Sequence, residues 1–111
     1  MKKILLSAFL IFNFTFLISH KTNAQYTNLY NFTDVPDGSH PDGSLVSDGS
    51  FLYGMTYSGG TSSWGTLFKI MPDGSGYLKL LDFVGAANGR SPSGSLISDG
   101  TFLYGMTGGG G

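Results

Sequence analysis

Hydrophobic positions along the chain fall into short runs that are separated by turn residues. After a longer apolar stretch at 4–18, runs of four to seven residues alternate with Asp-Gly, Gly-Gly and Pro-Asp-Gly segments. Short runs bounded by Gly, Pro, Asp and Ser are typical of β-strands joined by tight turns. The pattern predicts four strands in one unit, at 44–47, 51–57, 65–71 and 77–83.

The predicted strands lack a water-facing side. In 51–57 one face carries Phe, Tyr and Met, and the other carries Leu, Gly and Thr. A solvated antiparallel strand alternates apolar and polar residues, so this strand is expected to be buried on both faces between similar sheets. Strand 77–83 is expected to be an outer strand with Lys79 and Asp82 exposed on opposite sides. Gly54 and Gly105, each in mid-strand, indicate a close approach of neighbouring groups or a bulge.

The unit repeats with a period of 51 residues. Residues 26–60 align with 77–111 without a gap, and 19 of the 35 aligned pairs are identical. Four-stranded units of about 40–50 residues with a Gly-Gly pair are typical of β-propeller blades, and a β-solenoid is the alternative. We therefore expect an all-β chain of tandem four-stranded antiparallel units, arranged as in a propeller. Region 25–111 comprises about 1.7 units, so the array is expected to be incomplete here and to continue in a longer protein.

The first 24 residues are expected to be a signal peptide. Lys2 and Lys3 precede the apolar stretch, and the segment ends in Thr-Asn-Ala. The stretch is 15 residues long, whereas a membrane-spanning helix needs about 20. Cleavage between Ala24 and Gln25 would leave 25–111 secreted or at the cell surface, without a stable membrane span.

Composition excludes several classes of function. The chain has 18 Gly and seven Asp but no Glu and no Cys, which excludes disulfides, thiol nucleophiles and cysteine metal sites. Residues 25–111 keep three cations, Lys69, Lys79 and Arg90, against all seven Asp, a formal net charge of −4. Nucleic acid is therefore not an expected partner, and no cofactor is predicted.

Acid–base and metal chemistry are not predicted either. Four Asp crowd 34–48, but they lack the alternating spacing and the final bidentate carboxylate of a calcium-binding loop. Asp before Gly is common in hairpins because both turn positions need a positive φ. His40, the single histidine of residues 25–111, is placed in a loop, has Ser91 as its counterpart and is expected to be incidental. We predict no catalytic residue and no metal ligand.

Trp64 and Tyr57 are the candidate binding residues. Both lie beside the Gly-Gly loop at 58–63, where their rings could stack on a glycan or a peptide at the rim of a propeller. The alternative for Trp64 is a packing role as a wedge between two blades.

These motifs together resemble the GloVer (Gloeo-Verruco) tandem repeat. The shared elements are Asp-Gly-x-x-Pro, Leu-Tyr-Gly with a following Thr, Gly-Gly, Gly-Thr-Leu-Phe-Lys-Ile, Pro-Asp-Gly and Leu-Leu-Asp-Phe, between 37 and 83. Met55 and Met106 stand where the family usually has Thr, and Asn88 replaces an Asp. The resemblance implies an exported bacterial protein with several repeats, often with a C-terminal sorting or anchoring region. It implies no catalytic residue.

The sequence therefore predicts a non-catalytic extracellular scaffold for binding or surface display. Its expected partners are further repeats of the same chain and a glycan or protein at the rim. Two alternatives stay open: a propeller hydrolase or lyase with its active residues in other repeats, and a structural adhesin segment. The likeness of the two units favours the scaffold, because catalytic propellers interrupt their repeat with unique polar residues that point into the central channel.

Overall fold

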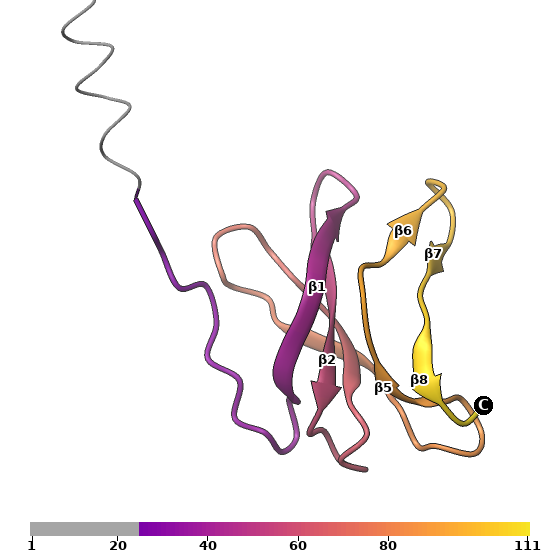
Figure 1. The fold of residues 1–111 in the computed structure, drawn as a ribbon. Coiled ribbons are helices and arrows are strands. Elements are labelled where there is room, and N and C mark those ends of the chain that lie inside the picture. The colour runs from indigo at the N-terminus through magenta and orange to yellow at the C-terminus, as the bar shows by residue number, and fades with distance from the viewer. Residues whose placement is uncertain (1–24) are drawn as a thin grey trace, which may run out of the picture.

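The computed structural model describes residues 25–111, in which every regular element is a β-strand (Figure 1). The first unit is a four-stranded antiparallel sheet in the order β1-β2-β3-β4. Its strands are β1 (Ser39–Ser47), β2 (Leu52–Ser58), β3 (Thr66–Ile70) and β4 (Leu78–Asp82). The all-β prediction and the four-stranded antiparallel unit are thus confirmed. The expected signal peptide, including Ala24, lies outside the described residues.

The second unit forms a hairpin in two parts. β5 (Arg90–Pro92) pairs with β8 (Thr107–Gly109), and β6 (Ile97–Ser98) pairs with β7 (Leu103–Tyr104). At the 51-residue spacing, β5 and β6 correspond to β1, and β7 and β8 correspond to β2. Among residues 25–111, no helix is long and apolar enough to cross a membrane.

β1 begins five residues earlier than the sequence predicts. Its pairing with β2 is irregular between Asp42 and Val46, and the corresponding segment of the second unit is where β5 and β6 separate. The irregularity lets a strand that contains Pro41 and Gly43 continue, although both residues argue against a strand. His40 consequently lies in β1 rather than in a loop, and its Nδ1 is 2.9 Å from the Ser58 hydroxyl.

The hairpin turns of both units are closed by an Asp side chain. One carboxylate oxygen of Asp48 accepts the N–H groups of Ser50 and Phe51 at 2.8 and 2.7 Å, and the other accepts the Tyr53 hydroxyl at 2.7 Å. Asp99 makes the same three bonds, to Thr101, Phe102 and Tyr104. Of the two residues in the predicted Asp-Gly turn only Gly49 has a positive φ, because the Asp contributes through its carboxylate instead.

Acid is expected to weaken this turn. The backbone N–H of Phe51, the Tyr53 hydroxyl and the N–H of Ser50 lower the pKa of Asp48 to about 2. Because the pKa is lower in the folded chain, the stabilisation is present above the ordinary value of 3.8 and is lost as the pH falls towards 2. A carboxyl NMR titration is expected to give a midpoint near 2 for Asp48. A midpoint near 3.8, or a pH dependence of unfolding between pH 5 and 2 that Asp48→Asn leaves unchanged, would contradict this.

The Gly-Gly pairs hold each unit to the turn before its first strand. Gly60 N–H donates to the Asp34 carbonyl at 2.7 Å, and Gly111 N–H donates to the Gly85 carbonyl at 2.9 Å. A Cβ on Gly59 would lie 2.6 Å from both Asp34 Oδ1 and the Ser39 nitrogen. The pair therefore recurs because a side chain would separate the loop from the turn.

The prediction that Lys79 and Asp82 point to opposite sides is wrong. Leu81 pairs with Leu67 but Lys79 pairs with Phe68, so one extra residue is inserted in β4. A bulge of this kind changes the alternation of side chains. Lys79 and Asp82 therefore lie on the same side, with Nζ 2.8 Å from Oδ2.

The first sheet is covered on both faces. We call residues 26–33 the arm; the side of the sheet that it covers is the arm face, formed by Leu45, Gly54 and Phe68. The opposite side is the hairpin face, where Met55 packs with Phe83 and Leu96, next to Val46, Tyr53 and Leu67. In Figure 1 the arm (indigo) and the second hairpin (orange to yellow) lie on opposite sides of β1 and β2.

The arm has no regular structure and is held by aromatic rings. Tyr30 stacks on Tyr77 with ring centroids 4.2 Å apart, and Phe32 lies edge-on to Phe68 at 5.1 Å. In the repeat alignment, 26–32 corresponds to 77–83, so the arm is the counterpart of β4 and the residues that flank it. Phe32 lines a pocket with Leu45 and Gly54, and its sequence equivalent Phe83 lines a pocket with Leu96 and Gly105.

Candidate functional site

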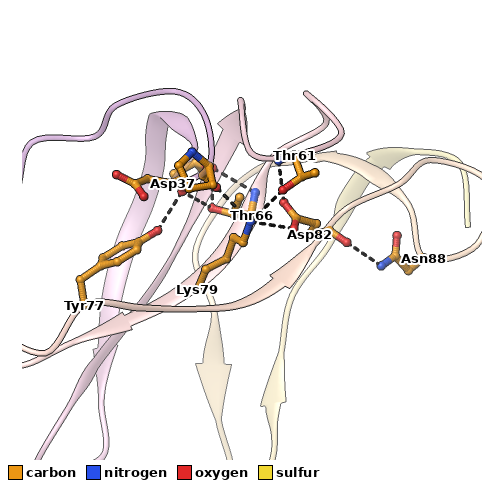
Figure 2. Close-up of polar contacts among 9 residues, drawn as sticks. Asp37, Thr61, Thr66, Tyr77, Lys79, Asp82 and Asn88 are labelled. Atoms are coloured by element: carbon orange, nitrogen blue, oxygen red, sulfur yellow. Dashed lines mark hydrogen bonds and ion pairs between the residues drawn. The ribbon is translucent and has the colours of Figure 1, made fainter.

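The densest polar cluster lies where the turn 34–38 meets the end of the first sheet (Figure 2). Thr56 and Thr66 are fully buried there, and their hydroxyls are 2.9 Å apart. Thr66 donates its hydroxyl to the Asp37 carbonyl at 3.0 Å, so Thr56 must be the donor to Thr66. Tyr77 donates to the same carbonyl at 2.8 Å. These bonds fix the turn to the sheet.

Lys79 connects three segments in the same cluster. Its Nζ donates to the Pro36 carbonyl and to the Thr61 hydroxyl, each at 3.0 Å, and pairs with Asp82. Asp82 also accepts the N–H of Thr61 at 3.0 Å through Oδ1. On its other side, Asn88 donates to the Asp82 carbonyl at 3.0 Å, as Figure 2 shows. The extra residue in β4 makes this arrangement possible.

The pKa values of the ionisable groups in and beside the cluster are shifted further from neutral pH. Burial, followed by the hydrogen bond to Asp37, raises the pKa of Tyr30 to about 12. The hydroxyls of Tyr30 and Thr33 hold the pKa of Asp37 below its ordinary value. Burial favours a higher pKa for Asp82, but the bonds from Lys79 and Thr61 outweigh it and lower the pKa. The tyrosine stays neutral and the carboxylates stay ionised, so the arrangement suits a structural role.

Trp64 lies at the junction of the two units. Its carbonyl accepts the N–H of Ser91 at 2.8 Å, and the Arg90 guanidinium lies 5.3 Å from the centre of its ring. The side chain is nevertheless 41% exposed. The indole thus has a face against the second unit and a face towards solvent, which fits both the packing and the stacking interpretation.

Tyr57, the second predicted binding residue, is 48% exposed. It follows Thr56 in β2, and Thr56 pairs with Thr66 of β3. The Tyr57 carbonyl faces Gly65, which is the residue after Trp64. The two candidates therefore come from facing ends of β2 and the loop before β3. No group of three or more metal-ligating side chains occurs within residues 25–111.

Comparison with known proteins gives one match. A family model described as the Gloeobacter/Verrucomicrobia repeat matches residues 11–111. The chain belongs to this family. No curated protein and no solved structure matches the chain. The recurrence of the Asp turn and of the Gly-Gly contact in both units gives the Gloeobacter/Verrucomicrobia repeat a physical basis in this chain.

Two pockets of this chain are related by the 51-residue repeat, and the sequence did not predict either of them. One, of about 270 Å³, is lined by the arm with Leu45, Gly54 and Phe68. The other, of about 320 Å³, is lined by Phe83, Leu96 and Gly105. The shared spacing of 51 between Leu45 and Leu96, and between Gly54 and Gly105, is the sequence signal that relates the pockets.

Proposed function

We propose that this chain is a non-catalytic extracellular scaffold whose units stack as the blades of a β-propeller and display loops for binding. The observation that carries the proposal is the contact between equivalent segments of the two first strands. Ser44 N–H donates to the Ser95 hydroxyl at 2.9 Å, and Gly94 N–H donates to the Asp42 carboxylate at 3.1 Å. These bonds join positions 51 and 52 residues apart.

Propeller stacking explains this contact better than a solenoid does. In a propeller the first strands of successive blades lie next to one another around a central channel. In a solenoid, equivalent strands of successive coils pair into continuous sheets. Within residues 25–111, β1 to β4 pair with one another, while β5 to β8 pair separately. The two units thus meet face to face and at their first strands.

The binding surface of this scaffold is proposed to include Trp64 and Tyr57. Both expose about half of an aromatic side chain near the junction of the units, and such rings stack on sugars and peptides. The Asp82 carboxylate beside the 58–63 loop is committed to Lys79 and to the Thr61 N–H, which favours binding over hydrolysis. Export through cleavage between Ala24 and Gln25 belongs to the same proposal, and N-terminal sequencing of the exported chain tests it.

Glycan and peptide arrays test the binding function. We expect Trp64→Ala and Tyr57→Ala each to weaken binding to a retained ligand at least about tenfold, as loss of a central aromatic contact does. Phe102→Ala is the matched control, because Phe102 is an exposed aromatic in the distant turn of β6 and β7. Equal losses in all three variants would contradict the assignment of the surface. Turnover of a glycan, peptide or ester by the chain would instead favour an enzyme.

A further inference from the structure

The two units differ in charge at the turn before the first strand and at the start of that strand. Residues 34–43 contain three Asp and no Lys or Arg, whereas the equivalent residues 85–94 contain Arg90 and no carboxylate. The formal charges of the two segments are therefore −3 and +1. The second segment borders the candidate binding surface, because a Cβ on Gly85 would lie 3.8 Å from Nε1 of Trp64. The indole ring thus lies next to a locally basic segment.

Ser39, which corresponds to Arg90 in the repeat, has its partners within its own unit. Its hydroxyl donates to the Asp34 carboxylate at 2.9 Å and lies 3.1 Å from the Ser58 hydroxyl and 3.4 Å from Nδ1 of His40. The equivalents of all three partners lie among the described residues of the second unit. The surroundings of the arginine can therefore be compared directly with those of the serine.

In the second unit, glycines replace the carboxylate partner and one hydroxyl partner. Gly85 stands in place of the carboxylate, and Gly109 stands in place of the β2 hydroxyl. The first replacement removes the group with which an arginine would pair. The second makes room for the longer side chain, because a Cβ on Gly109 would lie 3.1 Å from Nε of Arg90. The guanidinium consequently lies beside the Trp64 ring, and no carboxylate within residues 25–111 pairs with it.

This arrangement suits a ligand that has both an apolar face and a negative charge. A guanidinium beside an aromatic ring keeps in-plane N–H groups that bind a carboxylate in a bidentate manner. The half-exposed rings of Trp64 and Tyr57 suit the C–H face of a sugar. Neither of the two pockets includes these rings or Arg90, so the surface is an open platform, whereas peptides bind in grooves or along sheet edges. A uronic acid carries the C–H face and the carboxylate on one ring.

We propose that this surface binds acidic glycans, with a uronate ring against the Trp64 indole and its carboxylate on the Arg90 guanidinium. The inference rests on the proposed function and specifies the class of its ligand. Residues 25–111 have a formal net charge of −4, so the attraction for an anion is local to this segment and is not a property of the whole chain. The charge pair selects acidic over neutral sugars, and the ring supplies affinity for both.

Titration calorimetry with uronate oligomers tests the ligand class. The probes are oligomers of galacturonate, mannuronate and glucuronate, each compared with its fully methyl-esterified form, which keeps the sugar and removes the charge. We expect an acid form to bind at least about tenfold more tightly than its ester, as a charge-assisted hydrogen bond provides. The preference is expected to decrease as the salt concentration rises from about 50 to about 500 mM.

Arg90→Gln is expected to abolish the preference for the acid form and to leave the affinity for the ester unchanged. Lys69→Gln is the matched control, because Nζ of Lys69 lies 4.2 Å from the ring centre of Phe51 in the same kind of contact. Arg90→Lys is expected to keep part of the preference, since it keeps the charge and loses the bidentate geometry. An equal effect of Lys69→Gln would contradict the assignment of the site.

Gly85→Asp restores the carboxylate of the first unit and tests the replacement itself. An aspartate is tolerated there, because Asp34 has a φ of +72° at the equivalent position and Gly85 has a φ of +89°. The variant is expected to lose the preference for the acid form, since its carboxylate competes for Arg90. Gly85→Asn has the same size and no charge, and it is expected to keep the preference.

Several results would overturn the inference. These are no binding of any uronate, a preference that survives Arg90→Gln or Gly85→Asp, or tighter binding of oligoglutamate than of every uronate. Far-UV circular dichroism checks that each variant is folded, and Arg90→Lys replaces Arg90→Gln if the latter unfolds. Equal binding of acid and ester forms that Trp64→Ala abolishes would overturn this inference and leave the proposed function intact.

Discussion

Gly65→Ala is expected to destabilise the fold far more than Gly49→Ala, although the two glycines have the same backbone conformation. Their φ angles are +98° and +97°, a region in which an alanine costs about 1–3 kcal/mol. A Cβ on Gly49 would meet nothing within 4 Å. A Cβ on Gly65 would collide with the Thr56 carbonyl oxygen and lie 2.8 Å from Cδ of Pro92.

The environment of Gly65 leaves no room to relieve that collision. Its N–H donates to the Gly59 carbonyl and its carbonyl accepts the Phe83 N–H, both at 3.0 Å. Overpacking of this kind adds about 1–3 kcal/mol to the cost of the backbone strain. Urea unfolding of the two variants measures the difference directly. Equal free energies of unfolding would show that the loop before β3 can move away from β2.

Met55→Ala is expected to cost about 2–5 kcal/mol in the free energy of unfolding, because it leaves a cavity in the core between the two units. Met106→Ala is the matched control at the equivalent position and is expected to change the free energy by no more than about 0.5 kcal/mol. Thermal unfolding at a dilution where sedimentation shows a monomer measures both variants. Similar losses would mean that the second unit does not pack on Met55 as described.

Local chemistry explains which parts of the fold the sequence predicts well. The strands β2, β3 and β4 follow from short apolar runs between turn residues, and the close approach at Gly54 follows from a glycine in mid-strand. The turn at Asp48 is predicted from Asp-Gly, although Asp48 closes the turn with its carboxylate and does not adopt a positive φ. Each of these features depends on residues within a few positions of one another.

Features that depend on pairing register were predicted less well. The extra residue in β4 is set by how β3 and β4 align, and it alone brings Lys79 to the same side as Asp82. The length of β1, and with it the position of His40, depends on the irregular pairing between Asp42 and Val46. The local sequence pattern does not specify either strand alignment, since shifting one strand by a single residue changes every facing pair.

The sequence by itself determined the repeat, the all-β class and the positions of the tight turns. It could not determine which copy of an identical segment is buried. Phe-Leu-Tyr-Gly-Met-Thr occurs at 51–56 and again at 102–107, yet Met55 lies in the core and Met106 lies at the surface. Only the tertiary structure decided this, because strand and turn formation depend on neighbours in the chain. Burial depends on whether another unit stacks on the face.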